Sequence, residues 1–434
     1  MNRQGRRGLS KVQSRQKLLP IRQSNLAWSQ LNAHQRDLPC DNHIHIYFAA
    51  PMHVRPNKHF TPKNNWINDP NGLIFHSGYY HLFFQHNPQE NKWGHMSWGH
   101  AKSKDLINWE ELPVAIPEQP DHAIFSGSAV FDKEHNRLVA FYTGHKEGNQ
   151  SQYVAFSYDG GLTWSENQKV LDLEMADFRD PKVFRYENKW IMSVAKSKEL
   201  KISFFESTDL IDWNFLSDFH SPEVGEIYEC PDLFELDGKW ILLISTNPGG
   251  VAGGSGMHYL IGNFDGRAFT PESTAEFLDY GPDYYAAVTF NDAPEQISIG
   301  WMNNWRYAND PKFATSKSWN GSMTAARKLS LVDGKLKQEF IGQVETYKVD
   351  SGNFQFNYQN GALKFKNEKG KLIIDRSELW DFEISQFSLP VSSPYEIQAL
   401  FDAGSFELCI NGLTATALLQ VGPEIPQIER ISGM

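Results

Sequence analysis

The residues most able to do chemistry are three carboxylic acids that each stand shortly before a proline. Asp69 lies between two asparagines in the stretch Trp66-Ile-Asn-Asp-Pro-Asn-Gly72, and Asp180 and Glu229 stand one and two residues before a proline. Asn, Asp, Pro and Gly are also the residues that tight turns prefer, so one such stretch does not separate a site from a turn. The recurrence of acids in this setting favours chemistry.

A retaining glycosidase uses two carboxyl groups for catalysis. One is ionised and attacks the sugar, while the other is protonated and serves as acid and then base, at a separation of about 5 to 5.5 Å. Asp69 suits the first role and the longer Glu229 suits the second. Glu229 is flanked by Tyr228 and Cys230 and has other acids nearby, a setting that favours the protonated form.

A calcium site is the alternative for the same acids, because calcium also takes several oxygen ligands. None of the three acids lies in a local Asp-x-Asp-x-Asp ligand loop, and Arg179 stands directly beside Asp180. A guanidinium repels a cation but orients a carboxylate or a sugar hydroxyl. We therefore expect no metal and no cofactor.

The elements around these acids are predicted to be all β. From His59 onward, short β-rich runs alternate with Gly, Pro, Asn and Asp turns. A turn of the Ser-x-Asp type repeats with starts at residues 103, 157, 207 and 262, so the steps are 54, 50 and 55 residues, the last copy being degenerate. A period of about 50 residues built from four short strands is typical of a propeller blade.

Five apolar strands precede or accompany these turns and predict five blades. The strand before each of them carries, at one phase, Asp69, Ser126, Asp180, Glu229 and Ala286, with spacings of 57, 54, 49 and 57 residues. The first strand of every blade in a propeller lines the central channel. We therefore expect these five positions to converge on the axis, which would assemble the three acids into one site.

The chain divides into three predicted parts. Residues 1–58 form a basic extension that we interpret as a disordered tail or a start placed upstream of Met52, residues 59–345 the propeller, and residues 346–434 a short β-sandwich. Residues 1–36 hold eight Arg or Lys and no acid, but no apolar stretch of about 7 to 15 residues follows as in a secretory signal. This favours the cytoplasm over secretion.

Composition excludes several classes of partner. The 52 acidic and 41 basic residues give a net charge of -11, which argues against nucleic acid. No apolar run approaches the roughly 18 residues of a membrane span. Three scattered cysteines indicate neither a disulfide framework nor a zinc site. Aromatic residues make up 13% of the chain and suit either sugar stacking or strand cores.

Five motifs in this chain resemble the signature motifs of glycoside hydrolase family 32, the family of invertases, inulinases, levanases and other β-fructofuranosidases. In order along the chain they are Trp66-Ile-Asn-Asp-Pro-Asn-Gly72, Phe125-Ser-Gly-Ser128, Phe178-Arg-Asp-Pro-Lys-Val-Phe184, Tyr228-Glu-Cys-Pro-Asp-Leu233 and Gly300-Trp-Met-Asn-Asn-Trp-Arg-Tyr-Ala308. The resemblance runs from about His59 to Leu331 and continues weakly beyond.

The resemblance implies a five-bladed propeller followed by a β-sandwich, and hydrolysis of terminal β-D-fructofuranosides with retention. It implies that Asp69 is the nucleophile, Glu229 the acid and base, and Asp180 the stabiliser of the transition state. The implied substrate-binding residues are Asn68, Gln85, Trp93, Ser126 and Arg179, with Trp66 and Trp301 as walls.

Within the family, residues 301–308 and the Gly-rich residues 247–256 look like the exo-acting inulinase, levanase and yeast-type invertase branch. We therefore expect release of terminal fructose from sucrose and from the fructans inulin and levan. Two alternatives stay open: a fructosyltransferase on the same scaffold and a non-catalytic propeller that binds sugar. The oligomeric state is left undetermined.

Overall fold

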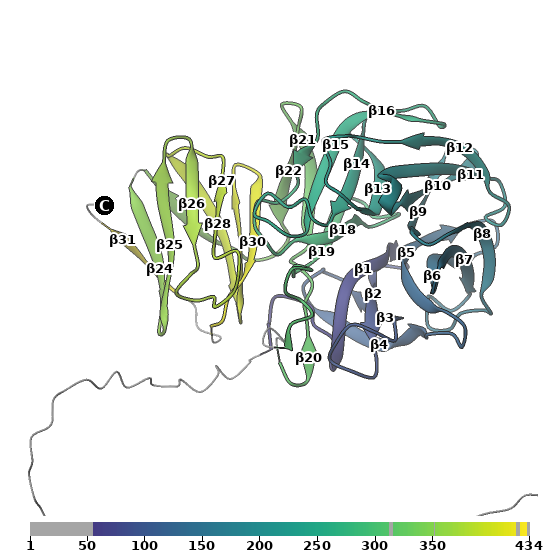
Figure 1. Cartoon of the computed structure of the whole chain (residues 1–434), viewed down its shortest axis with the longest axis horizontal. Helices are drawn as coiled ribbons and strands as arrows, with labels where there is room; N and C mark the ends of the chain where they lie inside the picture. The colour runs from purple at the N-terminus through teal and green to yellow at the C-terminus, as the bar shows by residue number, and fades with distance from the viewer. Residues whose placement is uncertain (1–54, 312–315, 351, 422–425, 432–434) are drawn as a thin grey trace, which may run out of the picture. The chain divides into compact units, whose positions relative to one another are not determined.

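The computed structural model describes residues 55–311, 316–350, 352–421 and 426–431. Strands up to β22 form five small sheets, which Figure 1 shows fanned around a common centre, and later strands form two more. The expected propeller and sandwich are confirmed. Of the basic extension expected over residues 1–58, residues 1–54 lie outside the described residues.

We call the five sheets blades, numbered along the chain. Blade 1 contains β1 (Asn65–His76), β2 (Tyr79–Asn87), β3 (Ser97–Ser103) and β4 (Trp109–Ile116). Blade 2 contains β5 (Ala123–Asp132), β6 (Arg137–Lys146), β7 (Asn149–Ser157) and β8 (Gln168–Met175). Blade 3 contains β9 (Phe178–Tyr186), β10 (Lys189–Lys196), β11 (Lys201–Ser207) and β12 (Asn214–Phe219), with the 3-10 helix η1 (Ser197–Glu199) between β10 and β11.

Blade 4 contains β13 (Tyr228–Leu236), β14 (Lys239–Thr246), β15 (Gly256–Phe264), β16 (Phe269–Pro271) and β17 (Glu276–Phe277). Blade 5 contains β18 (Tyr285–Thr289), β19 (Ile297–Trp301), β21 (Arg327–Val332) and β22 (Lys335–Phe340). Neighbours within the blades pair antiparallel, and the first strand of each blade contacts the first strand of the next. These first strands therefore form the inner ring.

The ring is closed by chain segments that join blade 5 to blade 1. Strand β20 (Trp319–Asn320) follows β19 in sequence but pairs parallel with the start of β1, where Asn65 faces Trp319. Ile74 of β1 also forms an isolated bridge with Asn291, just after β18. Such pairing leaves the inner edge of blade 1 partly covered, which limits the unpaired backbone groups of an open sheet edge.

Apolar side chains pack between every pair of neighbouring blades. Ile191 and Leu242 belong to the core between blades 3 and 4, and Phe83 and Tyr142 to the core between blades 1 and 2. Three further cores fill the junctions of blades 2 and 3, 4 and 5, and 5 and 1. Because both faces of each blade are buried in this way, the strands need the apolar runs seen in the sequence.

The repeated Ser-x-Asp turns are structural devices that end the third strand of a blade. Ser103 Oγ accepts a hydrogen bond from Leu106 N at 2.9 Å, and Asp105 Oδ1 accepts one from Asn108 N at 2.7 Å. The copy that starts at Ser157 repeats the pattern, since Gly161 N donates to Ser157 Oγ at 2.8 Å. These side chains satisfy backbone N–H groups that the turn leaves without strand partners.

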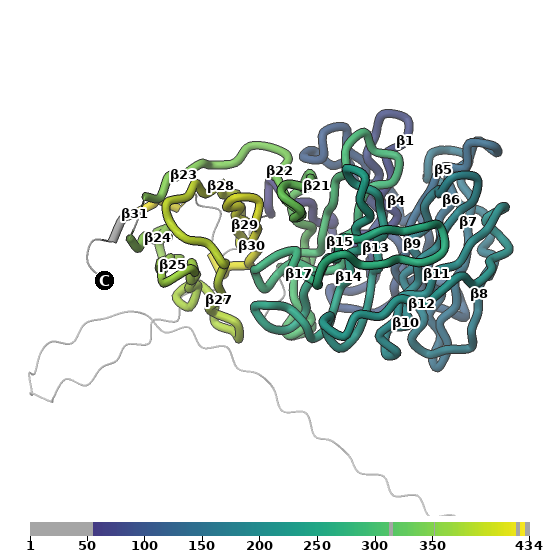
Figure 2. The backbone as a smooth tube through the Cα atoms, turned by 90° about the horizontal axis from the view of Figure 1, so that it is seen from above, coloured from purple at the N-terminus to yellow at the C-terminus, as the bar shows by residue number. Residues whose placement is uncertain are grey.

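The C-terminal strands form a sandwich. One sheet holds β23 (Glu345–Val349), β28 (Tyr395–Asp402), β29 (Ser405–Ile410) and β30 (Leu413–Leu418), and the other holds β24 (Asn353–Tyr358), β25 (Gly361–Glu368), β26 (Lys371–Asp375), β27 (Gln386–Leu389) and β31 (Gln427–Ile431). Figure 2 shows the two sheets in a view turned by 90°. One core with Phe356, Leu372 and Phe406 joins them.

Buried ion pairs join the sandwich to blade 5. Arg327 of β21 pairs with Asp279 at 2.8 Å and with Glu407 of β29, and Arg376 of the sandwich pairs with Asp283 at 2.8 Å. Every one of these side chains is buried. Among the described residues, no helix is long and apolar enough to cross a membrane.

Candidate active site

At one end of the inner ring, all five first strands carry a β-bulge at the same level. The shifts in register lie between Ile67 and Pro70, Ile124 and Gly127, Arg179 and Lys182, Glu229 and Asp232, and Tyr285 and Val288. A bulge bends a strand and turns a side chain away from the regular alternation. The five bulges therefore aim the expected residues at the mouth of the channel.

Asp69 sits in the first bulge, where two neutral donors hold its carboxylate. Ser126 Oγ from blade 2 donates to Asp69 Oδ2 at 2.7 Å, and Asn68 Nδ2 donates to Asp69 Oδ1 at 3.1 Å. Trp66 Nε1 in turn donates to Asn68 Oδ1 at 2.7 Å, which fixes the orientation of the amide. Both oxygens of Asp69 are thus oriented by hydrogen bonds.

Asp180 lies on the third bulge with a left-handed backbone, at a φ of 65°. An aspartate tolerates this region better than most residues, but the conformation is rare outside turns and functional sites. Cys230 N donates to Asp180 Oδ2 at 2.9 Å, and Thr143 Oγ1 accepts from Asp180 N at 2.9 Å. Three blades therefore fix the position of one carboxylate.

Cys230 lies between two of the acids. Its Sγ is 3.7 Å from Asp69 Oδ2 and 3.7 Å from Asp180 Oδ2. Burial and the surrounding carboxylates raise the pKa of the Cys230 thiol well above its usual value. The thiol therefore stays protonated and can donate a hydrogen bond to either carboxylate.

Glu229 is held by charged and phenolic donors. Arg179 Nε donates to Glu229 Oε1 at 3.1 Å, and the Tyr285 hydroxyl donates to Glu229 Oε2. Arg179 Nη1 also donates to Asp177 at 3.0 Å and to Gln150 Oε1 at 3.2 Å, so its guanidinium is fixed on three sides. Blades 2, 3 and 5 therefore share in orienting Glu229.

Burial, together with neighbouring acids, raises the pKa of Asp69 and of Asp180. Burial, the largest cause, raises the pKa of Asp69 to about 6; the hydrogen bonds from Ser126 and Asn68 act against the shift and nearby Glu229 adds to it. Burial likewise raises the pKa of Asp180, with Arg179 opposing and the other two acids adding to the shift. Arg179 is the guanidinium that balances part of this negative charge.

The substrate-binding residues expected from the sequence lie in two different surroundings. Trp93 is 43% exposed and meets Phe125 edge to face, and Phe125 stacks on His145 at 4.3 Å, which forms an aromatic wall beside Ser126. Gln85 is buried and donates to Ile124 O at 3.0 Å. Trp93 in this wall is exposed to solvent, whereas Gln85 is buried.

Trp66 and Trp301, expected as walls, are both fully buried. Their ring centroids are 6.0 Å apart, and Trp305, which keeps some exposed surface, packs on both. In this structure they support Asn68 from behind. The physical reason is packing, because indole rings at the start of β1 and the end of β19 fill the junction of blades 1 and 5.

Tyr285 is the main residue of the site that the sequence did not suggest. The regular spacing pointed to Ala286 in blade 5, but the bulge places the side chain one residue earlier against Glu229. A bulge shifts the phase by one residue and so moves a different side chain to the channel. Prolines at 70, 181 and 231 signal the bulges of blades 1, 3 and 4, since proline inside a strand marks an edge or a bulge, but β18 holds no proline and so gave no such signal for Tyr285.

Comparison with known proteins gives the family. The model of the glycosyl hydrolases family 32 N-terminal domain matches residues 59–339. The chain is 44% identical over 307 residues to a levanase of Bacillus subtilis, a match covering 64% of this chain and 45% of that protein. It is 41% identical over 390 residues to an extracellular exo-inulinase of Meyerozyma guilliermondii, covering 75% of each. An invertase of Debaryomyces hansenii is 42% identical over 401 residues, covering 80% of this chain and 74% of that one.

Solved structures agree with these relatives. The exo-inulinase of Aspergillus awamori aligns with a TM-score of 0.77 at 29% identity, covering 89% of this chain and 97% of that one. A fructofuranosidase variant of Schwanniomyces occidentalis complexed with fructosylnystose aligns with a TM-score of 0.77 at 29% identity, covering 88% of this chain and 95% of that one. A Bombyx mori β-fructofuranosidase mutant in complex with sucrose aligns with a TM-score of 0.73 at 26% identity, covering 86% of this chain and 90% of that one.

The chain spans less than half the length of the levanase and about three quarters of the two yeast relatives. The family model covers most of the described propeller, including all five bulges. The chain therefore belongs to glycoside hydrolase family 32 and is a glycoside hydrolase of the β-fructofuranosidase type.

Proposed function

We propose that this protein is a retaining, exo-acting β-fructofuranosidase that releases terminal β-D-fructofuranosyl residues from sucrose and from inulin and levan. The observation that carries most weight is that three first strands bring Asp69, Asp180 and Glu229 to one end of the inner ring. Cys230, the residue after Glu229, has its Sγ 3.7 Å from a carboxylate oxygen of both Asp69 and Asp180, and Arg179, the residue before Asp180, donates to Glu229 at 3.1 Å. Two neighbouring carboxyl groups that are each held by hydrogen bonds can serve as the nucleophile and as the acid and base.

In the proposed first step, an oxygen of ionised Asp69 forms a bond to the anomeric carbon C2 of fructose. The bond between C2 and the glycosidic oxygen breaks, and that oxygen takes the proton of Glu229 as the leaving sugar departs. Ser126 and Asn68 hold the attacking carboxylate in one orientation, so little freedom is lost when the bond forms.

In the proposed second step, Glu229 acts as a base. Its carboxylate takes a proton from water while the water oxygen bonds to C2, and the bond between C2 and Asp69 breaks. Fructose leaves with the configuration it had in the substrate, and both acids return to their starting forms. Arg179 and Tyr285 keep the Glu229 carboxylate in place between the two proton transfers.

Asp180 is the proposed stabiliser of the transition state. Its backbone is fixed by Thr143 and its side chain by Cys230 N, so the carboxylate stays in place while charge develops on the sugar ring. Fixed groups of this kind stabilise a transition state without having to reorganise. Asn68, Gln85, Trp93, Ser126 and Arg179 are the proposed substrate contacts, with Trp66 and Trp301 acting from behind Asn68.

The relatives support the choice of substrates. Those that match are named levanase, exo-inulinase and invertase, and two of the similar structures carry fructosylnystose and sucrose. These ligands share a terminal fructosyl group. We propose the same class of neutral substrate for this chain, consistent with its acidic net charge.

The test is release of glucose and fructose over time from sucrose, inulin and levan by the full chain. An exo-acting fructanase is expected to release free fructose from all three substrates and to form no oligosaccharides early in the reaction. Fructose from sucrose alone would narrow the enzyme to an invertase, and growth of longer fructosides at high sucrose would favour a transferase. The matched controls are Asp69→Asn, expected to be silent, and Asp212→Asn at an exposed turn, expected to be active.

The compartment stays a prediction. The cytoplasm was expected from residues 1–58, and residues 1–54 of these lie outside the described residues. The exo-inulinase relatives of Meyerozyma and Aspergillus are named extracellular, which is a property of those proteins. Fractionation of cells that express the full chain with its own N-terminus decides between the two compartments.

A further inference from the structure

A cavity of about 430 Å³ opens at the junction of blades 1 and 2, away from the acids. The turn between β1 and β2, the turn between β5 and β6, and the Ser-x-Asp turn that follows Ser157 line it. It lies at the far end of β1, since Asp69 and His76 are seven residues apart on that strand. At about 3.3 Å per residue, the cavity is about 20 Å from the proposed nucleophile.

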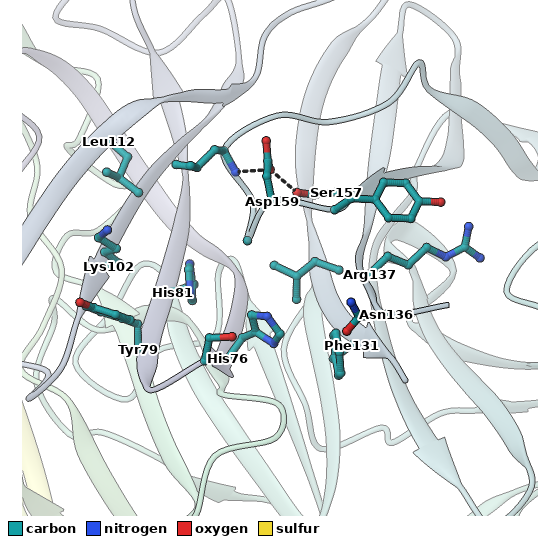
Figure 3. A pocket seen from close by; sticks show the side chains of 15 residues that line it. His76, Tyr79, His81, Lys102, Leu112, Phe131, Asn136, Arg137, Ser157 and Asp159 are labelled. Carbon is teal, nitrogen blue, oxygen red and sulfur yellow. Dashed lines mark hydrogen bonds between the residues drawn. The ribbon is translucent and has the colours of Figure 1, made fainter. Parts of the chain in front are cut away.

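Figure 3 shows the side chains around this cavity. Tyr79, His81 and Lys102 come from blade 1, and Phe131 and Asn136 come from blade 2 or its turn. The volume lies within the range of about 300 to 1,000 Å³ that small-ligand sites occupy. The cavity is therefore large enough to hold a sugar unit.

The charged side chains at the cavity already have partners. Lys102 pairs with Glu110 at 3.4 Å and lies over the Tyr79 ring, and Arg137 pairs with Asp132 at 2.9 Å. The Asp159 carboxylate accepts hydrogen bonds from its own turn, including Thr163 N at 2.9 Å. Because these side chains are already engaged, the cavity favours a neutral ligand over an ionic one.

Burial favours the neutral form of both histidines at the cavity, since it lowers the pKa of His81 to about 4 and also lowers the pKa of His76. His81 already shares a hydrogen bond of 3.0 Å with His100, so its Nδ1 is not open to a ligand. A neutral imidazole such as that of His76 offers one donor and one acceptor. Together with Asn136 and the Tyr79 hydroxyl, His76 suits a neutral ligand that carries many hydroxyl groups.

Apolar surface stands open at the rim. Tyr158 is 70% exposed and Leu162 is 53% exposed, and both line the cavity. An exposed aromatic face beside polar groups is the arrangement that packs against the C–H face of a sugar ring while its hydroxyls bond elsewhere.

Tyr158 is not needed to build its turn. The residue that follows Ser in the two close copies of this turn is Lys104 in blade 1 and Thr208 in blade 3. Those turns keep the same hydrogen bonds, for example from Leu210 N to Ser207 Oγ at 2.9 Å. The aromatic ring is therefore an addition to blade 2 alone among these three turns.

We propose that this cavity, with Tyr158 and Leu162 at its rim, binds a segment of a fructan chain at a second site, separate from the acids. The proposal rests on the proposed function, because a chain of fructose units is the neutral polyhydroxyl polymer that the enzyme would meet. Holding the polymer at a second point raises the effective concentration of chain ends at the active site. Sucrose, which is too short to occupy both sites, gains nothing.

The test is electrophoresis of the folded full chain through gels that contain inulin, levan or dextran. All variants carry Asp69→Asn, so that the polymer is not consumed and the active site is identical throughout. Tyr158→Ala is compared with the parent and with Phe215→Ala, a matched control at a residue 56% exposed on β12 that does not line the cavity.

We expect inulin or levan, and not dextran, to retard the parent and Phe215→Ala equally. Tyr158→Ala should bind about tenfold more weakly, as expected when a stacked aromatic ring is lost. In the active enzyme, Tyr158→Ala should lower kcat/KM on the polymer and leave kcat/KM on sucrose unchanged.

Equal retardation of Tyr158→Ala and the parent would overturn the second site, as would absence of retardation by both fructans. Retardation by dextran of the same strength would overturn its assignment to fructan. If the wild-type enzyme is active, any of these three results refutes only the cavity proposal. If the wild-type enzyme releases no fructose from sucrose, inulin or levan, the proposed function is refuted instead, whatever the gels show.

Discussion

Two clusters of buried charge in this protein have opposite designs. The mouth cluster consists of Asp69, Asp180 and Glu229 with the single guanidinium of Arg179. The interface cluster consists of Arg327, His59, Asp279, Asp402 and Glu407, between blade 5 and the sandwich. The first gathers charges of one sign, whereas the second alternates them.

The pKa shifts follow the pairing and not the burial. In the mouth cluster, burial and neighbouring carboxylates raise the pKa of Asp69 to about 6. In the interface cluster, burial alone would raise the pKa of Glu407, but Arg327 and His59 lower it to about 2. His59, which burial alone would make neutral, has its pKa raised to about 9 by Asp402 and Glu407.

The opposite pKa shifts of the two clusters fit two different physical requirements. A site that must exchange protons keeps its acids close to the pH at which both forms exist, at some loss of stability. A cluster that joins two folding units keeps its charges fixed and paired, because one missing partner leaves a buried charge uncompensated. Substitutions in the two clusters should therefore separate activity from stability.

The largest effect is expected for Asp69→Asn. Loss of the proposed nucleophile should lower kcat on sucrose by about 10⁴-fold or more, because the covalent step is lost. The midpoint of thermal unfolding should stay the same or rise, since a carboxylate crowded by like charges is removed. Steady-state kinetics and calorimetry on the same preparation measure both. Near-normal turnover in this variant would remove Asp69 from the mechanism.

The second largest effect is expected for Glu407→Gln, with the opposite profile. The amide leaves Arg327 and His59 short of one charge partner, which should lower the free energy of unfolding by about 3 to 5 kcal/mol. Chemical denaturation measures this loss. The matched control is Glu396→Gln, exposed on the neighbouring strand β28.

Turnover by Glu407→Gln should stay close to the wild-type value at temperatures where the variant is folded, because no ion pair among the described residues joins the mouth cluster to the interface cluster. A large fall in kcat with an intact fold would contradict the separation of the two clusters. Equal stability of Glu407→Gln and Glu396→Gln would show that the interface pairs contribute little.

The sequence predicted the mouth cluster far better than the interface cluster. The acids of the mouth repeat at steps of about 50 residues, so a propeller brings them together without any knowledge of side-chain contacts. His59 and Glu407 are 348 residues apart, with no repeat or motif to connect them. Their meeting depends on how the sandwich packs on blade 5, which periodicity does not encode.

Fine geometry at the mouth also escaped the sequence. Strand periodicity predicts which residues alternate toward the channel only if the strand is regular. A bulge adds one residue and so moves the neighbouring side chain to the channel. Tyr285, one residue before the position the spacing indicated, is the consequence in blade 5. The same limit applies to Trp66 and Trp301, because an aromatic residue beside a catalytic motif suits a wall and a core equally well in sequence.

The third expected effect is on how stability depends on pH. The folded pKa of Asp69, about 6, lies above its unfolded value of about 3.9, so its contribution to stability is fully present below pH 4 and is lost as pH rises through 6. The folded pKa of Glu407, about 2, lies below its unfolded value, so its contribution is present above about pH 4 and is lost as pH falls through 2.

Denaturation at several pH values tests this contrast. Between pH 4 and 7, Asp69→Asn should gain about 2 kcal/mol of unfolding free energy relative to wild type, while Glu407→Gln should remain less stable than wild type throughout. Below pH 4, the deficit of Glu407→Gln should shrink. Parallel pH profiles for both variants would show that the two clusters do not differ in the way their pKa shifts indicate.

The smallest expected effect is for Tyr285→Phe, which changes how the mouth cluster holds Glu229 and leaves all three acids in place. Its hydroxyl donates a hydrogen bond to Glu229 Oε2 and so helps to fix the orientation of that side chain. Without it, kcat should fall about tenfold with KM nearly unchanged, because the orientation of the proposed acid is lost in the transition state more than in binding.

The split between kcat and KM separates this role from a merely structural one. A misplaced acid lowers kcat and leaves KM and the midpoint of thermal unfolding nearly unchanged, whereas a packing defect also lowers that midpoint. Tyr284→Phe is the matched control, since Tyr284 precedes Tyr285 and lies under the Arg327 guanidinium on the other side of the strand. If both variants lose activity and thermal stability alike, Tyr285 contributes packing alone, and Arg179 is left as the residue that orients Glu229.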